Sequence, residues 1–240
     1  MSSESKICIE NTQIVILAGG LGTRLRPITE TITKVMIEVN GKPFLEHQFD
    51  YFKQFGFKKF LLLVSYLGMQ VEKHFKDGGK IGININYSYE KKPIGTGGAL
   101  KIAKNLIEDK FILIFGDTFY PLDFNELLLK AQEINKGGML VVYDNNEKIV
   151  SNNIKVESDL FVSKYSKSNN SSDMNGVDGG VSFFFKQVLD LIPEGENVSF
   201  EENVYPILIK DRLLRAYYTN TRFYDIGTFE RLNIIRNLIR

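Results

Sequence analysis

The sequence predicts an α/β fold, in which a doubly wound, mostly parallel sheet carries helices on both faces. Three strongly apolar runs, residues 14–17, 59–64 and 111–115, have the composition of strands buried on both faces. Segments of helical periodicity separate these runs, and a further helix and strand are expected at 124–134 and 139–143. Strands that alternate with helices usually pair in parallel through right-handed crossovers. The order of the elements therefore favours a Rossmann-like sheet.

The remaining elements follow from local patterns. Apolar residues at helical spacing predict a helix over residues 44–55, which Gly56 ends. A helix containing 71–75, a strand at 83–89 and a helix that opens at a second glycine loop, residues 93–98, come next. The carboxyl-terminal part is less regular, with strands expected at 160–162, 181–185 and 214–218 and helices at 187–191, 200–209 and 228–240. We expect this part to fold over the ligand-binding edge of the sheet.

We interpret the chain as a lead-in of residues 1–12 followed by one domain, residues 13–240. Residues 7–9 of the lead-in are a candidate edge strand. Residues 13–145 form the regular first half of this domain, and residues 146–240 form its less regular second half. At 240 residues the chain is long enough to bury a full core.

Composition excludes several classes of function. A net charge of +1 gives no electrostatic basis for binding nucleic acid or an acidic membrane. The single cysteine, Cys8, cannot form an internal disulfide, which is typical of a reducing compartment. The first residues lack the apolar core of a signal peptide, and no run approaches the roughly 18 apolar residues of a membrane span. We therefore expect a cytoplasmic protein without nucleic-acid or membrane partners.

A glycine-rich turn follows the first predicted strand directly. Gly19, Gly20 and Gly22 lie in this turn, within the sequence ILAGGLGTRLR. Glycine allows positive φ angles and close approach of the backbone to a ligand. Open α/β sheets bind ligands at the carboxyl ends of their strands, where exposed backbone N–H groups favour phosphate. The turn is therefore a candidate site for a nucleotide phosphate.

Three kinds of glycine loop compete for this turn. A P-loop would continue with lysine and serine or threonine, and Thr23 and Arg24 follow Gly22 instead, which excludes it. A dinucleotide fingerprint would have a third glycine where Leu25 stands. Glu38 nevertheless lies about where the ribose-binding carboxylate is expected, so this alternative stays open. The third kind, a nucleotidyltransferase loop, needs glycines followed at once by a cation.

The motif LAGGLGTRL, residues 17–25, resembles the opening motif of the sugar-1-phosphate nucleotidyltransferases, also called nucleotide-sugar pyrophosphorylases. The resemblance continues in order through residues 33–36 (TKVM), 41–45 (GKPFL), 93–99 (PIGTGGA), 116–119 (GDTF) and 224–228 (YDIGT). Within this family, the short chain and the stretches DGGVSFF and SFEE look most similar to bacterial heptose- or mannose-1-phosphate guanylyltransferases. The resemblance implies a transferase that acts in nucleotide-sugar and polysaccharide biosynthesis.

The reaction implied by this resemblance needs charge neutralisation and alignment. A sugar phosphate attacks the α-phosphorus of a nucleoside triphosphate, and pyrophosphate leaves. The nucleophile is already an anion, so two negatively charged reactants must be held in line. Mg²⁺ takes one or two carboxylates together with phosphate oxygens. By resemblance Asp117 and Asp225 hold this metal ion.

The resemblance also assigns the other site residues. Arg24 would stabilise the β- and γ-phosphates and Lys34 the charge near the α-phosphate, as the two catalytic cations. The predicted nucleotide-binding residues are Leu17, Ala18, Gly19, Gly20, Gly22, Thr23, Glu90, Gly95 and Thr96, with Glu90 and Gly95 at the base. The predicted acceptor-binding residues are Lys167, Gly180 and Glu201. The resemblance thus implies a single nucleotidyltransferase domain with residues 13–145 as its nucleotide-binding half and residues 146–240 as its acceptor-binding half.

Departures from the family pattern leave the identity of the acceptor substrate undecided. Val35 stands where the family has proline, and Ser166 precedes Lys167 where glutamate is usual, so that Lys164 competes with Lys167 for the acceptor phosphate. Asp178 stands where asparagine or another small residue is common. The resemblance favours GTP and a heptose or hexose 1-phosphate. A nucleotidyltransferase that uses CTP and a non-sugar phosphate is the alternative within the enzyme class.

A non-catalytic nucleotide-sugar sensor is the alternative from a different class of protein. Such a sensor could lose the charged groups of the reaction, whereas Arg24, Lys34, Asp117 and Asp225 are all retained. The retained charges favour an enzyme whose partners are a nucleoside triphosphate and a phosphorylated acceptor. The oligomeric state is left open, with a homodimer among the options.

Overall fold

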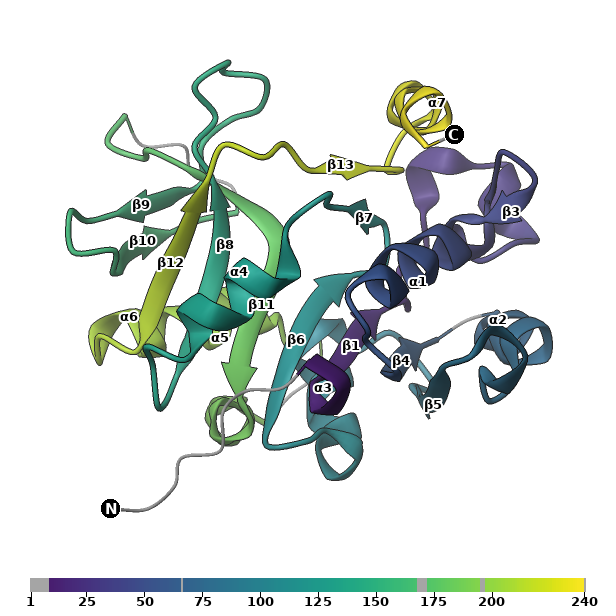
Figure 1. Ribbon diagram of the computed structural model, residues 1–240, viewed down its shortest axis with the longest axis horizontal. Coiled ribbons are helices and arrows are strands. Elements are labelled where there is room, and N and C mark those ends of the chain that lie inside the picture. Colours follow the sequence, from purple (N-terminus) through teal and green to yellow (C-terminus); the bar gives the residue numbers. More distant parts are fainter. Residues whose placement is uncertain (1–8, 66, 168–171, 195–196, 240) are drawn as a thin grey trace.

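The computed structural model describes residues 9–65, 67–167, 172–194 and 197–239. In this part of the chain the main sheet has seven strands in the order β12-β8-β11-β6-β1-β4-β5. They are β1 (Gln13–Leu17), β4 (Lys59–Val64), β5 (Asn84–Tyr89), β6 (Lys110–Phe115), β8 (Gly138–Tyr143), β11 (Val177–Phe185) and β12 (Leu214–Thr219). β11 is antiparallel to both of its neighbours, whereas the other neighbouring strands are parallel. The predicted α/β fold with a mostly parallel sheet is confirmed (Figure 1).

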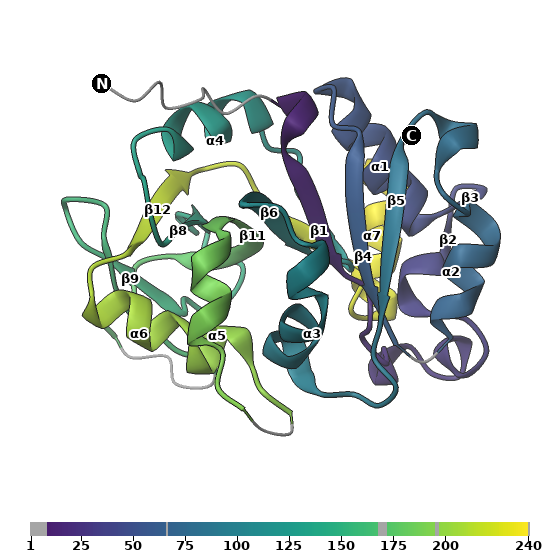
Figure 2. The same cartoon turned by 90° about the horizontal axis from the view of Figure 1, so that it is seen from below.

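Helices cover both faces of the sheet (Figure 2). One face packs against α1 (Phe44–Gln54), α2 (Gly68–Phe75) and α4 (Phe124–Ala131). The other packs against α3 (Gly95–Ala103), α5 (Phe200–Asn203) and α6 (Tyr205–Lys210). Along β1, Ile14 and Ile16 enter the first core and Val15 the second. Because both faces of β1 are buried, its apolar run does not alternate with polar residues.

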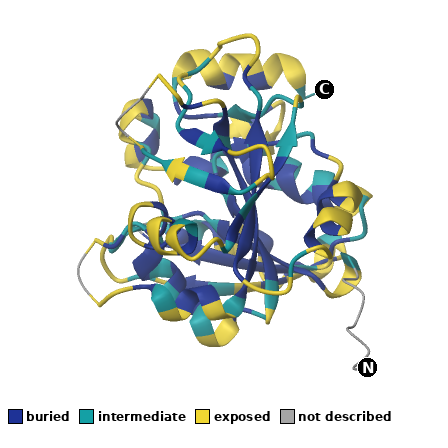
Figure 3. Ribbon diagram, turned by 90° about the vertical axis from the view of Figure 1, so that its left-hand side faces the viewer, coloured by how far each residue is buried: buried dark blue, intermediate teal, exposed yellow. Residues whose placement is uncertain are grey.

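Aromatic packing holds α1 against the sheet. Phe49 contacts Phe60 of β4 and Phe75 of α2 edge-to-face, and Phe52 contacts Phe124 of α4 in the same way. Each such pair contributes about 0.5–1.5 kcal/mol beyond the area it buries. Figure 3 shows that the strands beneath these helices are almost entirely buried. The strand ends that carry the glycine loops therefore belong to a firmly packed layer.

Short elements complete the edge of the sheet near the loops. β7 (Thr118–Phe119) pairs with β13 (Tyr224–Asp225) in antiparallel fashion, β2 (Glu38–Val39) with β3 (Lys42–Pro43), and β9 (Ile154–Val156) with β10 (Val162–Tyr165). The final helix, α7 (Phe229–Leu238), packs Leu232 and Ile235 against Leu25 and Phe44. Single 3₁₀ turns lie at Ile9–Asn11, Thr23–Leu25, Ile28–Glu30, Lys34–Met36, Gly79–Ile81, Lys104–Leu106 and Lys186–Leu191. The β7–β13 pair brings the carboxyl-terminal part of the chain to the end of β6.

The structure corrects several sequence-based boundaries in the carboxyl-terminal part. β11 and β12 join the main sheet rather than only folding over its edge. The helix expected at 200–209 is divided into α5 and α6, with Pro206 in the first turn of α6, where its missing N–H is tolerated. The segment 187–191 is 3₁₀ rather than α-helical. The strand expected at 160–162 begins only at Val162, because Leu160 has a φ angle of 65° in a turn.

The predicted lead-in is described only in part. Residues 1–8 lie outside the described ranges, and Ile9–Asn11 forms a 3₁₀ turn, so Ile9 does not extend an edge strand. Residues 168–171 likewise lie outside the described ranges. Among the described helices, none combines the length and apolar character needed to span a membrane.

Candidate active site

A cavity of about 320 Å³ lies at the carboxyl ends of β1, β4 and β6. Ten of the residues predicted from the sequence line it: Leu17, Ala18, Gly19, Gly20, Gly22, Lys34, Glu90, Gly95, Thr96 and Asp117. The two glycine loops, 76 residues apart between Gly19 and Gly95, thus meet in one cavity with a lysine and a carboxylate. Its position matches the ligand-binding edge of open α/β sheets.

The first glycine loop is held in shape by side chains from neighbouring segments. The Thr29 hydroxyl donates to the Gly22 carbonyl at 2.8 Å, and the Ser65 hydroxyl donates to the Gly19 carbonyl at 2.6 Å. Gly22 has a φ angle of 59°, and a Cβ atom there would lie 2.8 Å from Thr29 Cγ2. The loop therefore has its shape before any ligand arrives.

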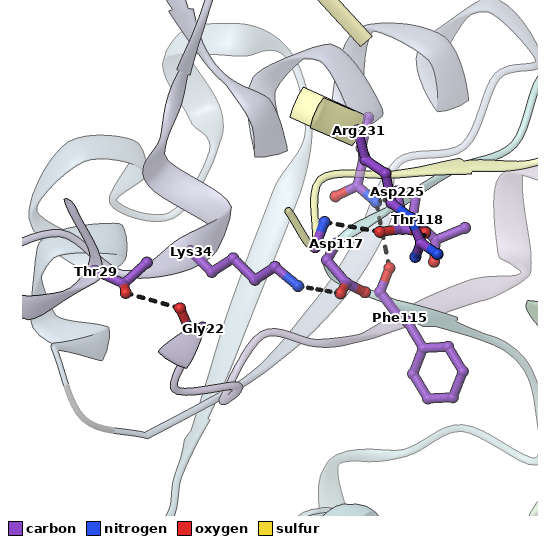
Figure 4. Close-up of polar contacts among 10 residues, drawn as sticks. Gly22, Thr29, Lys34, Phe115, Asp117, Thr118, Asp225 and Arg231 are labelled. Carbon is purple, nitrogen blue, oxygen red and sulfur yellow. Dashed lines mark hydrogen bonds and ion pairs between the residues drawn. The ribbon is translucent and has the colours of Figure 1, made fainter. Parts of the chain in front are cut away.

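Lys34 and Asp117 form an ion pair at the mouth of this loop. The Lys34 ammonium donates to Asp117 Oδ2, and Figure 4 shows the lysine reaching across to the carboxylate. The Lys34 side chain is 11% exposed and the Asp117 side chain 32% exposed. A cation and a carboxylate that face the same cavity are the groups needed to balance charge around a phosphate and its metal ion.

Asp225 lies next to Asp117 because β13 pairs with β7. Asp225 stands opposite Thr118 in this pair, and the Ile226 N–H donates to the Asp117 carbonyl at 3.0 Å. The Asp225 carboxylate accepts from the Gly227 N–H at 2.7 Å. It also accepts from the Arg231 guanidinium at 2.7 Å (Figure 4). Its side chain lines a second cavity, of about 240 Å³, between β13 and α7 rather than the main one.

Arg24 also reaches this turn, although it does not line the main cavity. A Cβ atom on Gly227 would lie 3.1 Å from an Arg24 guanidinium nitrogen. Arg24 and its neighbour Thr23 are exposed in the 3₁₀ turn after the glycine loop. The structure thus places Arg24 beside the β13 turn rather than deep among the loop residues.

The carboxylates near the cavity suit a metal ion that shares its coordination with a substrate. Asp225 belongs to β13, Asp117 immediately precedes its partner strand β7, and both supply hard oxygen donors. Within the described residues there is no group of three His, Cys, Asp or Glu side chains arranged to hold a metal. This set does not fit a closed zinc cage. It does fit Mg²⁺, which retains waters and accepts phosphate oxygens beside one or two carboxylates.

The second glycine loop packs against a distant segment of the chain. Gly95 has a φ angle of 80°, and a Cβ atom there would lie 2.3 Å from the Val198 carbonyl oxygen. Beside the loop, Glu90 Oε2 accepts from the Ile94 N–H at 3.3 Å. Burial raises the pKa of Glu90, and hydrogen bonds from Ile94 and Ser65 partly offset this. The loop therefore presents a half-buried carboxyl group to the cavity.

Gly95→Ala is expected to destabilise the protein more than Gly41→Ala. Both glycines have left-handed φ angles, 80° and 85°, and alanine in this region costs about 1–2 kcal/mol. A Cβ atom on Gly41 would have no neighbour within 4 Å, whereas one on Gly95 would also collide with Val198. Overpacking adds about 1–3 kcal/mol at Gly95. Urea denaturation of the two variants measures this difference, and equal losses would contradict it.

Glu201 is fully buried at the start of α5, with its two oxygens in different environments. Oε2 accepts from the Thr96 hydroxyl at 2.8 Å, the Ser199 hydroxyl at 2.8 Å and the Lys167 ammonium at 3.0 Å. Oε1 has no hydrogen-bond partner among the described residues. Burying an unpaired acceptor costs about 1–3 kcal/mol, so a hydrogen-bond donor that reached Oε1 would stabilise this group.

Two other predicted acceptor residues lie in this region. Lys167 reaches Glu201, whereas Lys164 pairs with Asp173, so the structure places Lys167 rather than Lys164 at this carboxylate. Gly180 has a φ angle of 73°, and a Cβ there would lie 2.7 Å from the Phe115 ring. The main cavity is not lined by Lys167, Gly180 or Glu201. Thr96, which does line it, donates a hydrogen bond to Glu201.

The carboxyl group of Asp178, close to these residues, has a pKa well above its usual range. Burial, helped by the charge of Glu201, raises its pKa to about 7, although the Gly180 N–H and Lys167 act in the opposite direction. The folded state therefore binds a proton that the unfolded chain, with a pKa near 3.8, releases at lower pH. It follows that this group makes the protein less stable as pH rises from about 4 to about 7.

Asp178→Asn is expected to remove that loss of stability. The difference between the two proteins is the free energy of unfolding of the parent minus that of the variant. This difference should fall by a few kcal/mol between about pH 4 and pH 7 and then level off. Urea denaturation across this pH range measures the difference, and Asp109→Asn, at an exposed position before β6, is the matched control. A difference curve without slope would contradict the prediction.

The cavity also contains residues that the sequence reasoning did not assign to it: Leu21, Val35, Leu63, Pro93, Ala99, Phe115 and Asn197. Most of these residues adjoin the motifs or the ends of apolar strands, and that position in the sequence could have identified them. Asn197 carried no such signal. It reaches the cavity because the next residue, Val198, exchanges backbone hydrogen bonds with Ile94 and Gly97.

A mostly parallel sheet whose edge brings two glycine loops together with Lys34 and Asp117 is the arrangement of an enzyme of the nucleotidyltransferase class. A family model for nucleotidyl transferases matches residues 13–239. The chain belongs to this family, and its relatives place it among the sugar-1-phosphate nucleotidyltransferases.

Comparison with individual proteins gives the same class. The chain is 36% identical over 219 residues to D-glycero-alpha-D-manno-heptose 1-phosphate guanylyltransferase from Campylobacter jejuni, covering 91% of this chain and 96% of that one. It is 30% identical to mannose-1-phosphate guanylyltransferase from Mycobacterium tuberculosis, covering 90% of this chain but only 61% of that relative. The crystal structure of HddC from Yersinia pseudotuberculosis, complexed with GMP-PN, has a TM-score of 0.77 at 26% identity. That match covers 95% of this chain and 100% of HddC.

Proposed function

We propose that this enzyme transfers GMP from GTP to a heptose or hexose 1-phosphate, releasing pyrophosphate. The observation that carries the proposal is Glu201, a buried carboxylate with one oxygen held by three donors and the other without a partner among the described residues. A polyhydroxylated acceptor supplies hydroxyl donors for that free oxygen. Lys167 beside it supplies a charge for a phosphate. The similarity to a heptose 1-phosphate guanylyltransferase over almost the full length of both chains supports the same acceptor class.

The preference for guanine is supported by Glu90. Guanine carries two adjacent donors, N1–H and the 2-amino group, whereas the corresponding positions of cytosine are acceptors. The Glu90 carboxyl group lines the nucleotide cavity beside the second glycine loop, and the Ile94 N–H helps to orient it. A carboxylate accepts two such donors side by side, as it does from an arginine fork.

The residues of the cavity suit an in-line displacement at the α-phosphorus. An oxygen of the acceptor phosphate forms a bond to this phosphorus, and the bond to the oxygen that bridges to the β-phosphate breaks. The backbone of residues 19–22 cradles the triphosphate, and Lys34 neutralises charge at the α-phosphate. Arg24, near the β13 turn, neutralises the departing pyrophosphate. No proton transfer is needed at the nucleophile, because a phosphate oxygen is already an anion.

Asp117 and Asp225 are the residues that would hold Mg²⁺. The bound ion would neutralise the phosphates and help to align the reactants. Both carboxylates already carry directed hydrogen bonds from Lys34, Gly227 or Arg231, and partners of this kind orient metal ligands. The donor chemistry therefore supports a magnesium-dependent reaction.

A pyrophosphate-release screen tests this proposal. ATP, GTP, CTP, UTP and dTTP are each combined with sugar 1-phosphates and with non-sugar phosphates such as inositol 1-phosphate, in the presence of Mg²⁺. We expect the highest kcat/KM for GTP with a heptose or hexose 1-phosphate. Preference for CTP with a non-sugar phosphate would replace the proposed substrates. Binding without turnover for every pair would identify a sensor rather than an enzyme.

A further inference from the structure

The second glycine loop is joined to the segment that carries Glu201 by hydrogen bonds on both sides of Thr96. The Val198 N–H donates to the Ile94 carbonyl, and the Gly97 N–H donates to the Val198 carbonyl, both at 2.8 Å. Gly95 and Val198 are in such close contact that no side chain fits between them. Residues 94–97 and 197–201 therefore behave as one packed unit, although about a hundred residues separate them in the sequence.

Within this unit, the Thr96 hydroxyl connects the nucleotide cavity to the buried carboxylate of Glu201. It accepts from the Phe200 N–H at 2.9 Å and donates to Glu201 Oε2 at 2.8 Å. Thr96 itself lines the nucleotide cavity, as does Asn197 at the other end of the linked segment. The hydroxyl proton is thus committed to the buried carboxylate rather than to a nucleotide.

The three donors on Oε2 determine which oxygen of Glu201 stays free. Thr96, Ser199 and Lys167 all approach Oε2, which leaves Oε1 as the oxygen without a described partner. The Lys167 side chain is 45% exposed, whereas Ser199 also accepts from the Glu202 N–H as the cap of α5. Thr96 is likewise held by a backbone N–H of α5, and it differs from the other two donors because it also lines the nucleotide cavity.

We propose that Thr96 is a positioning residue that couples the nucleotide pocket to the acceptor pocket. Its hydroxyl orients Glu201 so that Oε1 faces an acceptor hydroxyl. A nucleotide that orders residues 93–97 then also orders Glu201, so the acceptor binds more tightly once the nucleotide is present. This inference rests on the proposed function, because it takes Glu201 to be part of the acceptor site. By linkage the coupling is reciprocal, so the acceptor tightens nucleotide binding by the same factor.

Threonine variants in the full-length enzyme test this coupling. Thr96→Val has the same shape but lacks the hydroxyl, and Thr96→Ser keeps the hydroxyl. Thr31→Val is the matched control, since the Thr31 hydroxyl is exposed and makes only a 3.5 Å contact within its own turn. Calorimetry measures the Kd of mannose 1-phosphate alone and with guanosine 5′-(α,β-methylene)triphosphate, which cannot release pyrophosphate. Steady-state kinetics give KM for both substrates.

We expect Thr96→Val to raise the KM for the acceptor about tenfold. The ratio of the acceptor Kd without nucleotide to the acceptor Kd with nucleotide should fall by a similar factor. A tenfold change corresponds to about 1.4 kcal/mol, the net contribution of one buried hydrogen bond. The Kd of the guanosine nucleotide measured alone should change less than about twofold, whereas its Kd in the presence of saturating acceptor should rise by the same factor as that of the acceptor. Thr96→Ser should restore both values, and Thr31→Val should leave them unchanged. This pattern separates positioning from a general structural role.

Two results would overturn the proposal. Unchanged Kd ratios in Thr96→Val show that the hydroxyl does not couple the pockets. Rises in the Kd of the nucleotide alone and of the acceptor alone, not restored by Thr96→Ser, show that the residue only supports the loop. Failure of the proposed function appears differently, as absence of binding by the parent enzyme. The Kd ratios are then measured with the substrate pair that the pyrophosphate screen selects, and the same criteria apply.

Discussion

Asp117→Asn is expected to lower kcat/KM for pyrophosphate release by at least about a hundredfold, without a large change in unfolding temperature. Loss of groups that merely orient a metal ligand typically costs about 10–100-fold, so loss of a proposed ligand should cost at least as much. Asparagine keeps the size of the side chain and removes the charge that faces Lys34. Turnover is measured as a function of Mg²⁺ concentration, and the fold is checked by thermal unfolding.

Asp109→Asn is a closely matched control for this variant. Asp109 is exposed and immediately precedes β6, whereas Asp117 follows the same strand at its other end. The same chemical change is thus made at the two ends of one strand, and we expect parental kinetics from Asp109→Asn. If Asp117→Asn turned over like the parent at saturating Mg²⁺, the assignment of Asp117 to the metal would be wrong.

Lys34→Met should produce the second large effect, a fall in kcat of about 10²–10³-fold with a smaller change in KM. This is the range found when one preorganised group that stabilises transition-state charge is removed. Methionine fills the space of the mostly buried lysine stem but carries no charge. Asp117 is 32% exposed, so water can solvate it when its partner is lost, and the variant should stay folded.

Two further variants define what Lys34 contributes. Lys58→Met removes a lysine whose 3.4 Å ion pair with Glu10 is exposed at the surface, and it should not affect kcat. Lys34→Arg keeps the charge but replaces a compact ammonium by a planar fork, and we expect partial activity. Rates are measured with both substrates saturating. A Lys34→Met enzyme that kept its kcat and lost only affinity for GTP would make Lys34 a binding residue rather than a catalytic one.

Much of the nucleotide cavity was predictable because its residues follow strands directly in the sequence. Parallel strands end at one edge of a sheet, so an apolar run followed by a glycine turn or by Gly116 and Asp117 locates the site without any knowledge of long-range contacts. The antiparallel direction of β11 could not be predicted in this way. A strand buried on both faces has the same composition whether it pairs in parallel or in antiparallel fashion.

The connection between the nucleotide cavity and Glu201 could not be predicted from local sequence patterns. It depends on backbone hydrogen bonds of Ile94 and Gly97 with Val198, and these place Asn197 at the cavity and Thr96 beside Glu201. No periodicity marks a residue for a contact 104 positions away. Similarly, the second cavity beside Asp225 arises from the packing of α7 against β13, which only the folded chain reveals.

The insertion of β11 between β6 and β8 has a consequence for how the enzyme is made and divided. β8 is complete at Tyr143, but both of its partners, β11 and β12, are synthesised later. A nascent chain that has just passed residue 145 carries both glycine loops and Asp117, yet β6 has a bare edge and β8 has no neighbour. Such edges favour aggregation and delay cooperative folding. We therefore expect that the nucleotide pocket does not fold as an independent module, because β11 and β12 complete the sheet that carries it.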